Sequence, residues 1–309
     1  MIEVEALRKT FRGGRGLNGF SLRVETNELV GLVGPNGAGK TTLIKILATL
    51  VAASSGTVRV NGHDVAGDPR AIRAVVGYLP DVPGVYQDMR VGEFLEFFAD
   101  AFRLKEPRRT EAIQRALELS GLPNRTEDFV EQLSLGWKQR LLVAKTLLHQ
   151  PKVLLLDEPA TGLDPLARIA LREQLKRLHS EGVAILISSH ILSDLEDICT
   201  RVVFIAEGKN VSEPPASTVS SGAPQAMIRC EIEFRGPKET AEQAAAGFSG
   251  AHILKSEKGF LLLELPGGSR EASSFLQALL HAGIVVLHFD ARGPGLEERY
   301  RRAFGEIPR

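Results

Sequence analysis

Strongly apolar runs alternate with segments of helical spacing through the first two thirds of the chain. Three of these runs have the length of one strand and are almost wholly apolar: Val30–Val33, Val153–Leu156 and Val183–Ser188. Such runs are typical of strands that are buried on both faces of a parallel sheet. Leu166–His179 follows Pro165 and precedes Gly182, which is the expected pattern for the start and the end of a helix. The pattern therefore predicts an α/β domain over about residues 1–210.

The strand pattern is missing between Tyr78 and Gln150. Apolar residues recur there at helical spacing, in one group at Val91, Phe94, Leu95, Phe98 and Phe102 and in another at Ile113, Ala116 and Leu117. Steps of three and four residues place such side chains on one face of a helix. We therefore expect a helical subdomain inserted at about residues 82–150.

The segment 211–226 is rich in Pro, Ser, Gly and Ala and is predicted to be a linker. Beyond it, over residues 227–309, the predicted order is strand, helix, strand, strand, helix, strand. These elements are Ile228–Phe234, Glu239–Ala246, Ala251–Lys255, Phe260–Glu264, Ser273–His281 and Ile284–Phe289. The order βαββαβ is that of a ferredoxin-like fold, so we expect a small C-terminal α+β domain.

Composition narrows the class of protein. Lys plus Arg equals Asp plus Glu, 38 against 38, so no excess of positive charge favours nucleic acid as a partner. The two cysteines, Cys199 and Cys230, form no disulfide framework and have no metal-ligand spacing, which fits a reducing cytosol. No stretch approaches the roughly 20 apolar residues of a membrane span. Any role at a membrane is therefore expected to come through a partner.

A glycine-rich loop follows the first buried strand and precedes a segment of helical spacing. Its sequence, Gly-Pro-Asn-Gly-Ala-Gly-Lys-Thr, satisfies G-x-x-x-x-G-K-[ST] in the required strand–loop–helix context. Backbone N–H groups of such a loop converge on phosphate oxygens. Lys40 is expected to contact the β- and γ-phosphates, and the Thr41 hydroxyl to bind Mg²⁺. The expected nucleotide-binding residues are Gly34, Pro35, Asn36, Gly37, Ala38, Gly39, Lys40, Thr41 and Thr42.

Two carboxylates stand where a second buried strand leaves the core. Asp157 and Glu158 follow the apolar run Val153–Leu156. Asp157 suits Mg²⁺, and Glu158 suits the general base that takes a proton from an attacking water molecule. An apolar run that ends in acidic residues is weak by itself, but beside a phosphate loop it indicates a nucleotide-hydrolysing site.

The segment Leu-Ser-Leu-Gly-Trp-Lys-Gln-Arg, at 133–140, resembles the signature Leu-Ser-Gly-Gly-Gln of ABC (ATP-binding cassette) proteins. Leu135 replaces the first glycine of that signature, and Trp137 replaces the glutamine. The chain has no Asn/Thr-Lys-x-Asp motif of a GTPase. Residues 1–210 therefore resemble the nucleotide-binding domain of ABC proteins. The resemblance implies a P-loop NTPase fold of ABC type in which Ser134 and Gly136 contact phosphate. Taken alone, Ser134 would be a helix cap.

Four further positions are assigned by the same resemblance. Asp164 lies in the family's D-loop and also suits a helix N-cap. His190 occupies the place of the switch histidine, which contacts the γ-phosphate. Phe11 lies where the family stacks an aromatic ring on adenine, although it could equally belong to the core of an N-terminal sheet. Asp81 stands where the family has the glutamine of its Q-loop. It is expected either to meet Mg²⁺ or to lie at the interface with a membrane partner.

In the family, two such domains close face to face, and each ATP lies between one phosphate loop and the other subunit's signature. A single phosphate loop therefore implies a homodimer or a pair with a related ATPase subunit. The resemblance implies an Mg²⁺-dependent ATPase subunit of an ABC transporter. We expect it at the cytoplasmic face of the cell membrane, peripherally bound to integral membrane permease subunits that dock near Asp81 and the helices of Val91–Leu119.

The direction of transport is inferred from the end of the chain. The tail from Gly293 to Tyr300 is similar to the Pro-x-Leu-Glu-x-hydrophobic tail of drug- and polysaccharide-type exporters, which favours export. An alternative is a soluble ABC-type ATPase that acts on ribosomes or DNA. Those proteins typically have two cassettes in one chain, or a long coiled-coil insertion, and they have a basic surface. This chain instead has a single cassette, a short helical insertion and zero net charge. The third candidate, an unrelated P-loop kinase, is disfavoured by the signature and the D-loop.

Overall fold

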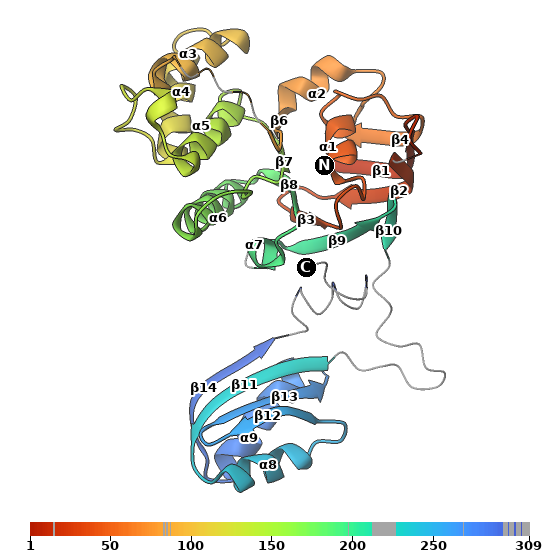
Figure 1. Cartoon of the computed structure of the whole chain (residues 1–309), viewed down its shortest axis with the longest axis vertical. Coiled ribbons are helices and arrows are strands. Elements are labelled where there is room, and N and C mark those ends of the chain that lie inside the picture. The colour runs from red at the N-terminus through yellow and green to blue at the C-terminus, as the bar shows by residue number, and fades with distance from the viewer. Residues whose placement is uncertain are drawn as a thin grey trace. The chain divides into compact units, whose positions relative to one another are not determined.

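The computed structural model describes residues 1–14, 16–82, 84, 86, 88–196, 198–211, 227–267, 269–292, 296, 300 and 304. The chain divides into an N-terminal unit, Met1–Val211, and a C-terminal unit, Ser212–Arg309. Figure 1 labels their helices and strands. Apart from Val211, the predicted linker 211–226 lies outside the described residues. So does most of the predicted exporter-like tail, of which only Leu296 and Tyr300 are described.

An antiparallel sheet of four strands opens the N-terminal unit, in the order β2-β1-β4-β5. Its strands are β1 (Ile2–Thr10), β2 (Gly16–Val24), β4 (Ser55–Val60) and β5 (His63–Asp64). Along β1 and β2 the buried side chains largely alternate with exposed ones, so one face of the sheet contributes to the core. The apolar runs discussed above did not predict this sheet, since none of its strands is continuously apolar.

The second sheet has six strands in the order β10-β9-β3-β8-β7-β6. They are β3 (Leu29–Val33), β6 (Val76–Leu79), β7 (Val153–Asp157), β8 (Ala184–Ser189), β9 (Arg201–Ala206) and β10 (Lys209–Val211). All pairs are parallel except β9 with β10. Every residue of β3, β7 and β8 is buried, which confirms the three predicted strands within one residue at each end. Their carboxyl ends meet at one edge of the sheet, where open parallel sheets bind ligands.

The helices that accompany the two sheets of this unit are α1 (Lys40–Leu47), α2 (Pro69–Val75), α6 (Pro165–Ser180) and α7 (Leu192–Glu196). Asp164 caps α6 by accepting a hydrogen bond from the Ala167 backbone N–H at 2.8 Å, and Pro165 occupies its first turn. These are the start signals expected from the sequence.

Helices without sheet strands fill the region after β6, as predicted. They are α3 (Val91–Ala101), α4 (Arg108–Ser120) and α5 (Leu135–Leu147), with a short 3₁₀ turn at Val130–Gln132. Figure 1 shows these helices as a lobe beside the strands. Phe94 and Leu95 are buried, but Phe102 follows the end of α3 and is 37% exposed. Phe102 is the C-cap residue of α3: its backbone N–H donates to the Phe98 carbonyl at 2.9 Å and both residues line one pocket, so it shares the predicted helix face without being buried.

The C-terminal unit confirms the predicted βαββαβ order. Its elements are β11 (Met227–Arg235), α8 (Lys238–Ala246), β12 (His252–Glu257), β13 (Phe260–Pro266), α9 (Ser269–His281) and β14 (Val285–Arg292). The strands form one antiparallel sheet in the order β12-β13-β11-β14, and both helices pack on it. Alternate residues of β11 and β13 join Phe275 and Leu279 of α9 in a separate core. Within the described part of the chain, no helix is both long enough and apolar enough to cross a membrane.

Candidate functional site

The phosphate loop is a tight turn between β3 and α1 that requires glycine at several positions. Gly37 and Gly39 have φ angles of 81° and 112°, in the left-handed region that side chains disfavour. A Cβ atom on Gly34 would lie 2.1 Å from the Ile205 carbonyl oxygen on β9. The loop therefore lies directly against the next strand, and its backbone is free to turn N–H groups toward a phosphate.

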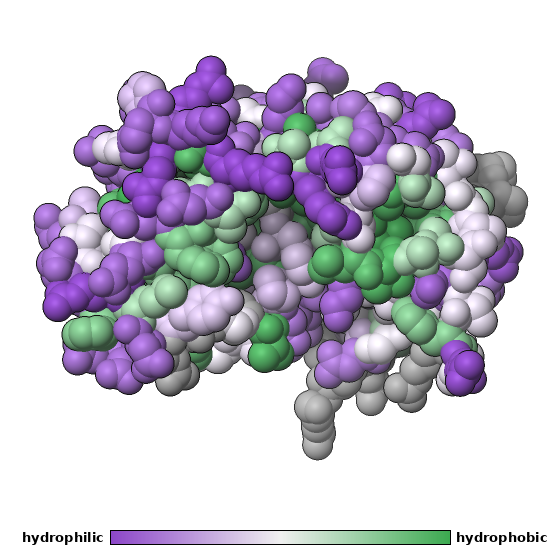
Figure 2. All heavy atoms as spheres, turned by 90° about the horizontal axis from the view of Figure 1, so that it is seen from above, coloured by the Kyte–Doolittle hydropathy of each residue, from purple (hydrophilic) through white to green (hydrophobic). Residues whose placement is uncertain are grey.

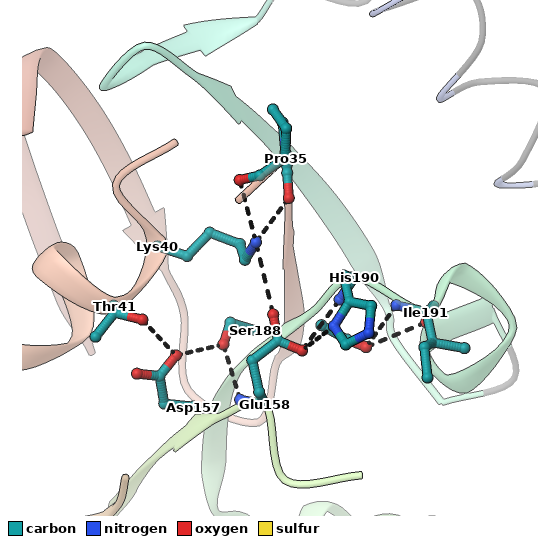
Figure 3. Close-up of polar contacts among 10 residues, drawn as sticks. Pro35, Lys40, Thr41, Asp157, Glu158, Ser188, His190 and Ile191 are labelled. Atoms are coloured by element: carbon teal, nitrogen blue, oxygen red, sulfur yellow. Dashed lines mark hydrogen bonds and ion pairs between the residues drawn. The ribbon is translucent and has the colours of Figure 1, made fainter. Parts of the chain in front are cut away.

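Lys40 begins α1 and is only 6% exposed. Its ammonium donates a hydrogen bond to the Gly34 carbonyl at 2.6 Å and lies 3.5 Å from Glu158 Oε1 (Figure 3). Burial of a charged group is tolerated when such partners compensate it. Phosphate oxygens that enter the loop would compete with these two partners for the same ammonium group.

Asp157 is the last residue of β7 and is fully buried. Its Oδ1 accepts hydrogen bonds from Ser188 Oγ at 2.7 Å and from Thr41 Oγ1 at 3.2 Å (Figure 3). Burial raises the pKa of the Asp157 carboxyl; the two hydrogen bonds oppose that rise, and the charges of Asp81 and Glu158 add to it. Its other oxygen, Oδ2, has no hydrogen-bond partner among the described residues.

These features fit a divalent cation. A buried carboxylate oxygen without a partner is costly unless a cation or a donor meets it. Mg²⁺ is usually held by one or two protein oxygens, together with water and substrate phosphates. Thr41 and Asp157 offer such oxygens side by side. The described part of the chain contains no group of three or more His, Cys, Asp and Glu residues that could hold a metal without the phosphates.

Glu158 leaves the strand end with a φ angle of 50°, an uncommon conformation for a residue other than glycine. Its Oε2 accepts a hydrogen bond from the His190 backbone N–H at 3.2 Å and lies 2.6 Å from His190 Nδ1. Its side chain is only 12% exposed. Contacts on both oxygens, with Lys40 and His190, hold this carboxylate in one orientation.

A pocket of about 340 Å³ brings most of the predicted nucleotide-site residues together, although Gly34, Pro35 and Asp157 are not part of its lining. Its lining comprises Phe11, Gly16, Asn36, Gly37, Ala38, Gly39, Lys40, Thr41, Thr42, Asp81, Glu158, Thr161 and His190. Phe11 follows β1 and is 44% exposed, so the alternative of a buried core residue does not hold. Tyr78 of β6 lies close to the acidic side of the site. Its own burial, and then the charges of Asp157 and Asp81, raise the pKa of Tyr78 to about 12.

Three residues of this site were missed by reasoning from the sequence. Gly16 and Thr161 line the pocket, and Ser188 bridges the two acidic residues by bonding Asp157 and accepting from the Glu158 backbone N–H at 3.0 Å. Ser188 was assigned only to the end of a strand. The signal that could have found it is its position: a polar residue at the carboxyl end of a strand that is otherwise apolar.

The signature residues lie elsewhere. Ser134 caps α5 by accepting a hydrogen bond from the Trp137 backbone N–H at 3.4 Å. Gly136 packs so closely on α6 that a Cβ atom would lie 2.7 Å from Ala167 Cβ. Neither Ser134 nor Gly136 nor Asp164 lines the pocket that contains Lys40. The structure therefore does not bring the signature and the phosphate loop of one chain to the same pocket.

A phosphate loop, a buried Asp at the end of another strand of the same sheet and a positioned Glu define a P-loop nucleotide-hydrolysing domain. The family model described as ABC transporter matches residues 17–161. The chain is 38% identical over 302 residues to the "Uncharacterized ABC transporter ATP-binding protein YxlF" of Bacillus subtilis, with 97% of this chain and 98% of that protein covered. It is 36% identical over 310 residues to the "Nod factor export ATP-binding protein I" of Burkholderia thailandensis, with 98% and 97% covered.

A solved structure supports the same family assignment. The structure described as "Structure of ATP binding subunit of ABC transporter" matches with a TM-score of 0.62 and 32% identity, over 69% of this chain and 88% of that one. The chain therefore belongs to the ABC transporter family, as an ATP-binding subunit with ATPase activity.

Proposed function

We propose that this chain is the Mg²⁺-dependent ATPase subunit of an ABC exporter and that Glu158 is its general base. The observation that carries the assignment of the base is the carboxylate held between Lys40 and His190 at the pocket wall. A general base must lie within reach of the proton it takes, and a fixed orientation improves that geometry.

Each of the other residues has a defined task in this proposal. Phe11 offers a half-exposed ring for adenine, and the backbone of residues 34–42, of which 36–42 line the pocket, binds the phosphates. Thr41 and Asp157 hold Mg²⁺, which when bound neutralises phosphate charge. His190 orients the Glu158 carboxylate, and Glu158 takes a proton from the attacking water. Asp81 lies at the same pocket, where it either meets Mg²⁺ or transmits the state of the site to a partner.

The active site is completed by a second subunit, either another copy or a related ATPase. Ser134 and Gly136 stand at the start of α5, a helix N-terminus of the kind that binds phosphate, but away from their own chain's pocket. In the dimer they contact the ATP bound by the partner's phosphate loop.

Mixing two inactive variants tests this composite site. Lys40→Ala removes the phosphate contact, and Ser134→Arg blocks the signature. A mixed dimer contains one site with both defects and one site with neither. It should trap ATP at about one site per dimer, whereas each variant alone should trap none. If a dimer shown to be mixed traps no ATP, the composite site is wrong.

Export and membrane attachment rest on a different observation. The similarity to the Nod factor export ATP-binding protein I extends over 98% of this chain and thus includes the C-terminal unit. We propose that integral membrane permease subunits bind the helical lobe, which places the chain at the cytoplasmic face of the membrane. A second pocket, of about 270 Å³, supports this site; it is lined by Ala48, Leu50, Arg73, Val76, Tyr78, Phe98, Phe102, Lys145, Thr146 and His149. On the face seen in Figure 2, hydrophobic residues border a hollow.

Co-purification with a neighbouring gene product tests the direction. Export is supported if the chain co-purifies with a permease and if inverted membrane vesicles accumulate a fluorescent amphiphile only when ATP is added outside. A requirement for a periplasmic binding protein would overturn export. Co-purification with ribosomes or DNA instead of a permease would favour the alternative of a soluble ABC-type ATPase.

A further inference from the structure

Trp137 lies in the first turn of α5, where the family signature has glutamine, and it is the only tryptophan of the chain. Two guanidinium groups lie over its ring. Arg125 Cζ is 4.3 Å from the ring centroid, and Arg140 Cζ is 4.4 Å from it. Both distances are well within the roughly 6 Å over which a cation is attracted to an indole face.

The two cations differ in their other partners. Arg125 also pairs with Asp128, with Nη1 2.8 Å from Oδ2. In the described part of the chain no carboxylate forms an ion pair with Arg140, and burial lowers the pKa of this guanidinium. The indole ring is thus one attractive partner of the Arg140 charge, and the C-terminal end of α4 is another. A Cβ atom on Gly121 would lie 3.2 Å from Arg140 Nη1, which places Arg140 at the C-terminal end of α4.

The ring therefore connects the start of α5 with the segment that precedes it in the chain. Arg125 belongs to the loop after α4, and Arg140 reaches the end of α4 itself. On another side, Gly136 leaves no space between α5 and Ala167 of α6. The first turn of α5 is thus held against α6 through Gly136 and against the α4 end through Trp137.

This turn also carries the groups that meet phosphate in the proposed dimer. The Trp137 backbone N–H donates to Ser134 Oγ, and Gly136 is the residue before Trp137. A shift of the Trp137 backbone therefore acts on the Ser134 hydroxyl through this hydrogen bond and on Gly136 through the chain.

We propose that Trp137 is a positioning residue of the composite ATP site. By its contacts with Arg125 and Arg140 it fixes the first turn of α5, so that Ser134 and Gly136 meet the phosphate of the ATP bound by the second subunit. A glutamine side chain has no ring face and could not form these two cation–π contacts. The proposal rests on the composite site proposed above, and its test separates the two.

The test places one substitution on either side of a dimer that has a single complete site. Both chains carry Glu158→Gln to stop hydrolysis. One chain also carries Lys40→Ala and the other Ser134→Arg, so the complete site uses the signature of the Lys40→Ala chain. Trp137→Ala is then added either to that chain, where its signature is in use, or to the Ser134→Arg chain, where the signature is already blocked. Retention of radiolabelled Mg-ATP is measured for each dimer.

The loss of ATP retention caused by Trp137→Ala should depend on which chain of the dimer carries the substitution. In the Lys40→Ala chain, Trp137→Ala should weaken ATP retention about 10-fold, the order expected when two cation–π contacts are lost. In the Ser134→Arg chain, the same substitution should change retention less than about twofold. Trp137→Phe in the Lys40→Ala chain keeps an aromatic face and should restore most of the retention. Arg140→Met, which keeps the ring and the aliphatic stem, should give a smaller loss with the same dependence on side.

Other results contradict the proposal in distinct ways. Equal losses on both sides would show that Trp137 supports only the folding of the subdomain. No loss on either side would show that the ring contacts do not position the signature. If the parent dimer without a Trp137 change retains no ATP, the composite site itself fails, and the role of Trp137 fails with it. Melting curves of each chain identify a variant that does not fold; in that case the comparison of Arg140→Met on the two sides decides the question.

Discussion

Glu158→Gln isolates the chemistry of the proposed general base because it keeps the size and shape of the side chain. The amide oxygen of the substituted side chain can still accept a hydrogen bond from the His190 backbone N–H, which in the native chain reaches Glu158 Oε2 at 3.2 Å. What is lost is the negative charge and the ability to take a proton. Turnover should therefore fall while the shape of the pocket stays the same.

The structure sets the expected size of both effects. Loss of a positioned base costs about 10²–10⁴-fold in rate, which corresponds to about 3–5 kcal/mol in the activation barrier. Binding should not suffer. Lys40 Nζ lies 3.5 Å from Glu158 Oε1, a gross attraction on the order of 5 kcal/mol at an effective dielectric constant of about 20. Removing that carboxylate leaves the ammonium free for phosphate and removes a charge that repels ATP.

Steady-state ATPase kinetics and equilibrium binding of ATP measure the two effects separately. We expect kcat to fall at least about 100-fold with an unchanged or lower Kd for Mg-ATP, and ATP-bound dimers should accumulate in light scattering. The matched control is Glu118→Gln on the exposed surface of α4, which should leave kcat unchanged. Turnover within about tenfold of wild type would refute the assignment of Glu158, since a lost base costs more than that.

Three further changes test other parts of the molecule. Because burial raises the pKa of Asp157, ionisation of this carboxyl destabilises the nucleotide-free fold as the pH rises from the ordinary pKa of Asp through the raised one, and the full cost is present above it. Asp157→Asn should therefore raise the melting temperature at neutral pH, with a gain that shrinks on acidification; a gain independent of pH would contradict this. Asp81→Asn should raise the Mg²⁺ concentration needed for half-maximal ATPase activity more than the KM for ATP. Unchanged Mg²⁺ dependence with lost transport would restrict Asp81 to the partner interface, and an inactive Asp81→Gln would show that this is not the Q-loop position. A chain truncated near residue 215 should still bind ATP, as isothermal titration calorimetry can measure, because every proposed nucleotide contact precedes that point; loss of all binding would contradict separate folding.

Features that depend on neighbouring residues followed from the sequence. The phosphate loop needs only a buried strand, glycines that allow left-handed turns and a following lysine, and all are contiguous. The acidic residues at the end of β7 and the start signals of α6 could likewise be predicted from contiguous residues. The βαββαβ order of the C-terminal unit also followed, because most of its strands and helices show their own spacing of apolar residues; the almost wholly exposed β12 does not.

Tertiary structure alone decided which of these local features meet. Ser188 bonds Asp157, and His190 holds Glu158, because β7 and β8 are neighbours in the sheet and end at the same edge. The sequence of a continuously apolar strand does not indicate which strand pairs with it. The sequence could therefore identify these residues but not predict their contacts. Trp137 is the sharper case. In the sequence it departs from a signature. Arg140 follows it by three residues in the same helix, a spacing the sequence already shows, but only folding of the loop after α4 brings Arg125 over the ring. Contacts between residues far apart in the chain depend on packing, and packing is not encoded in any one segment.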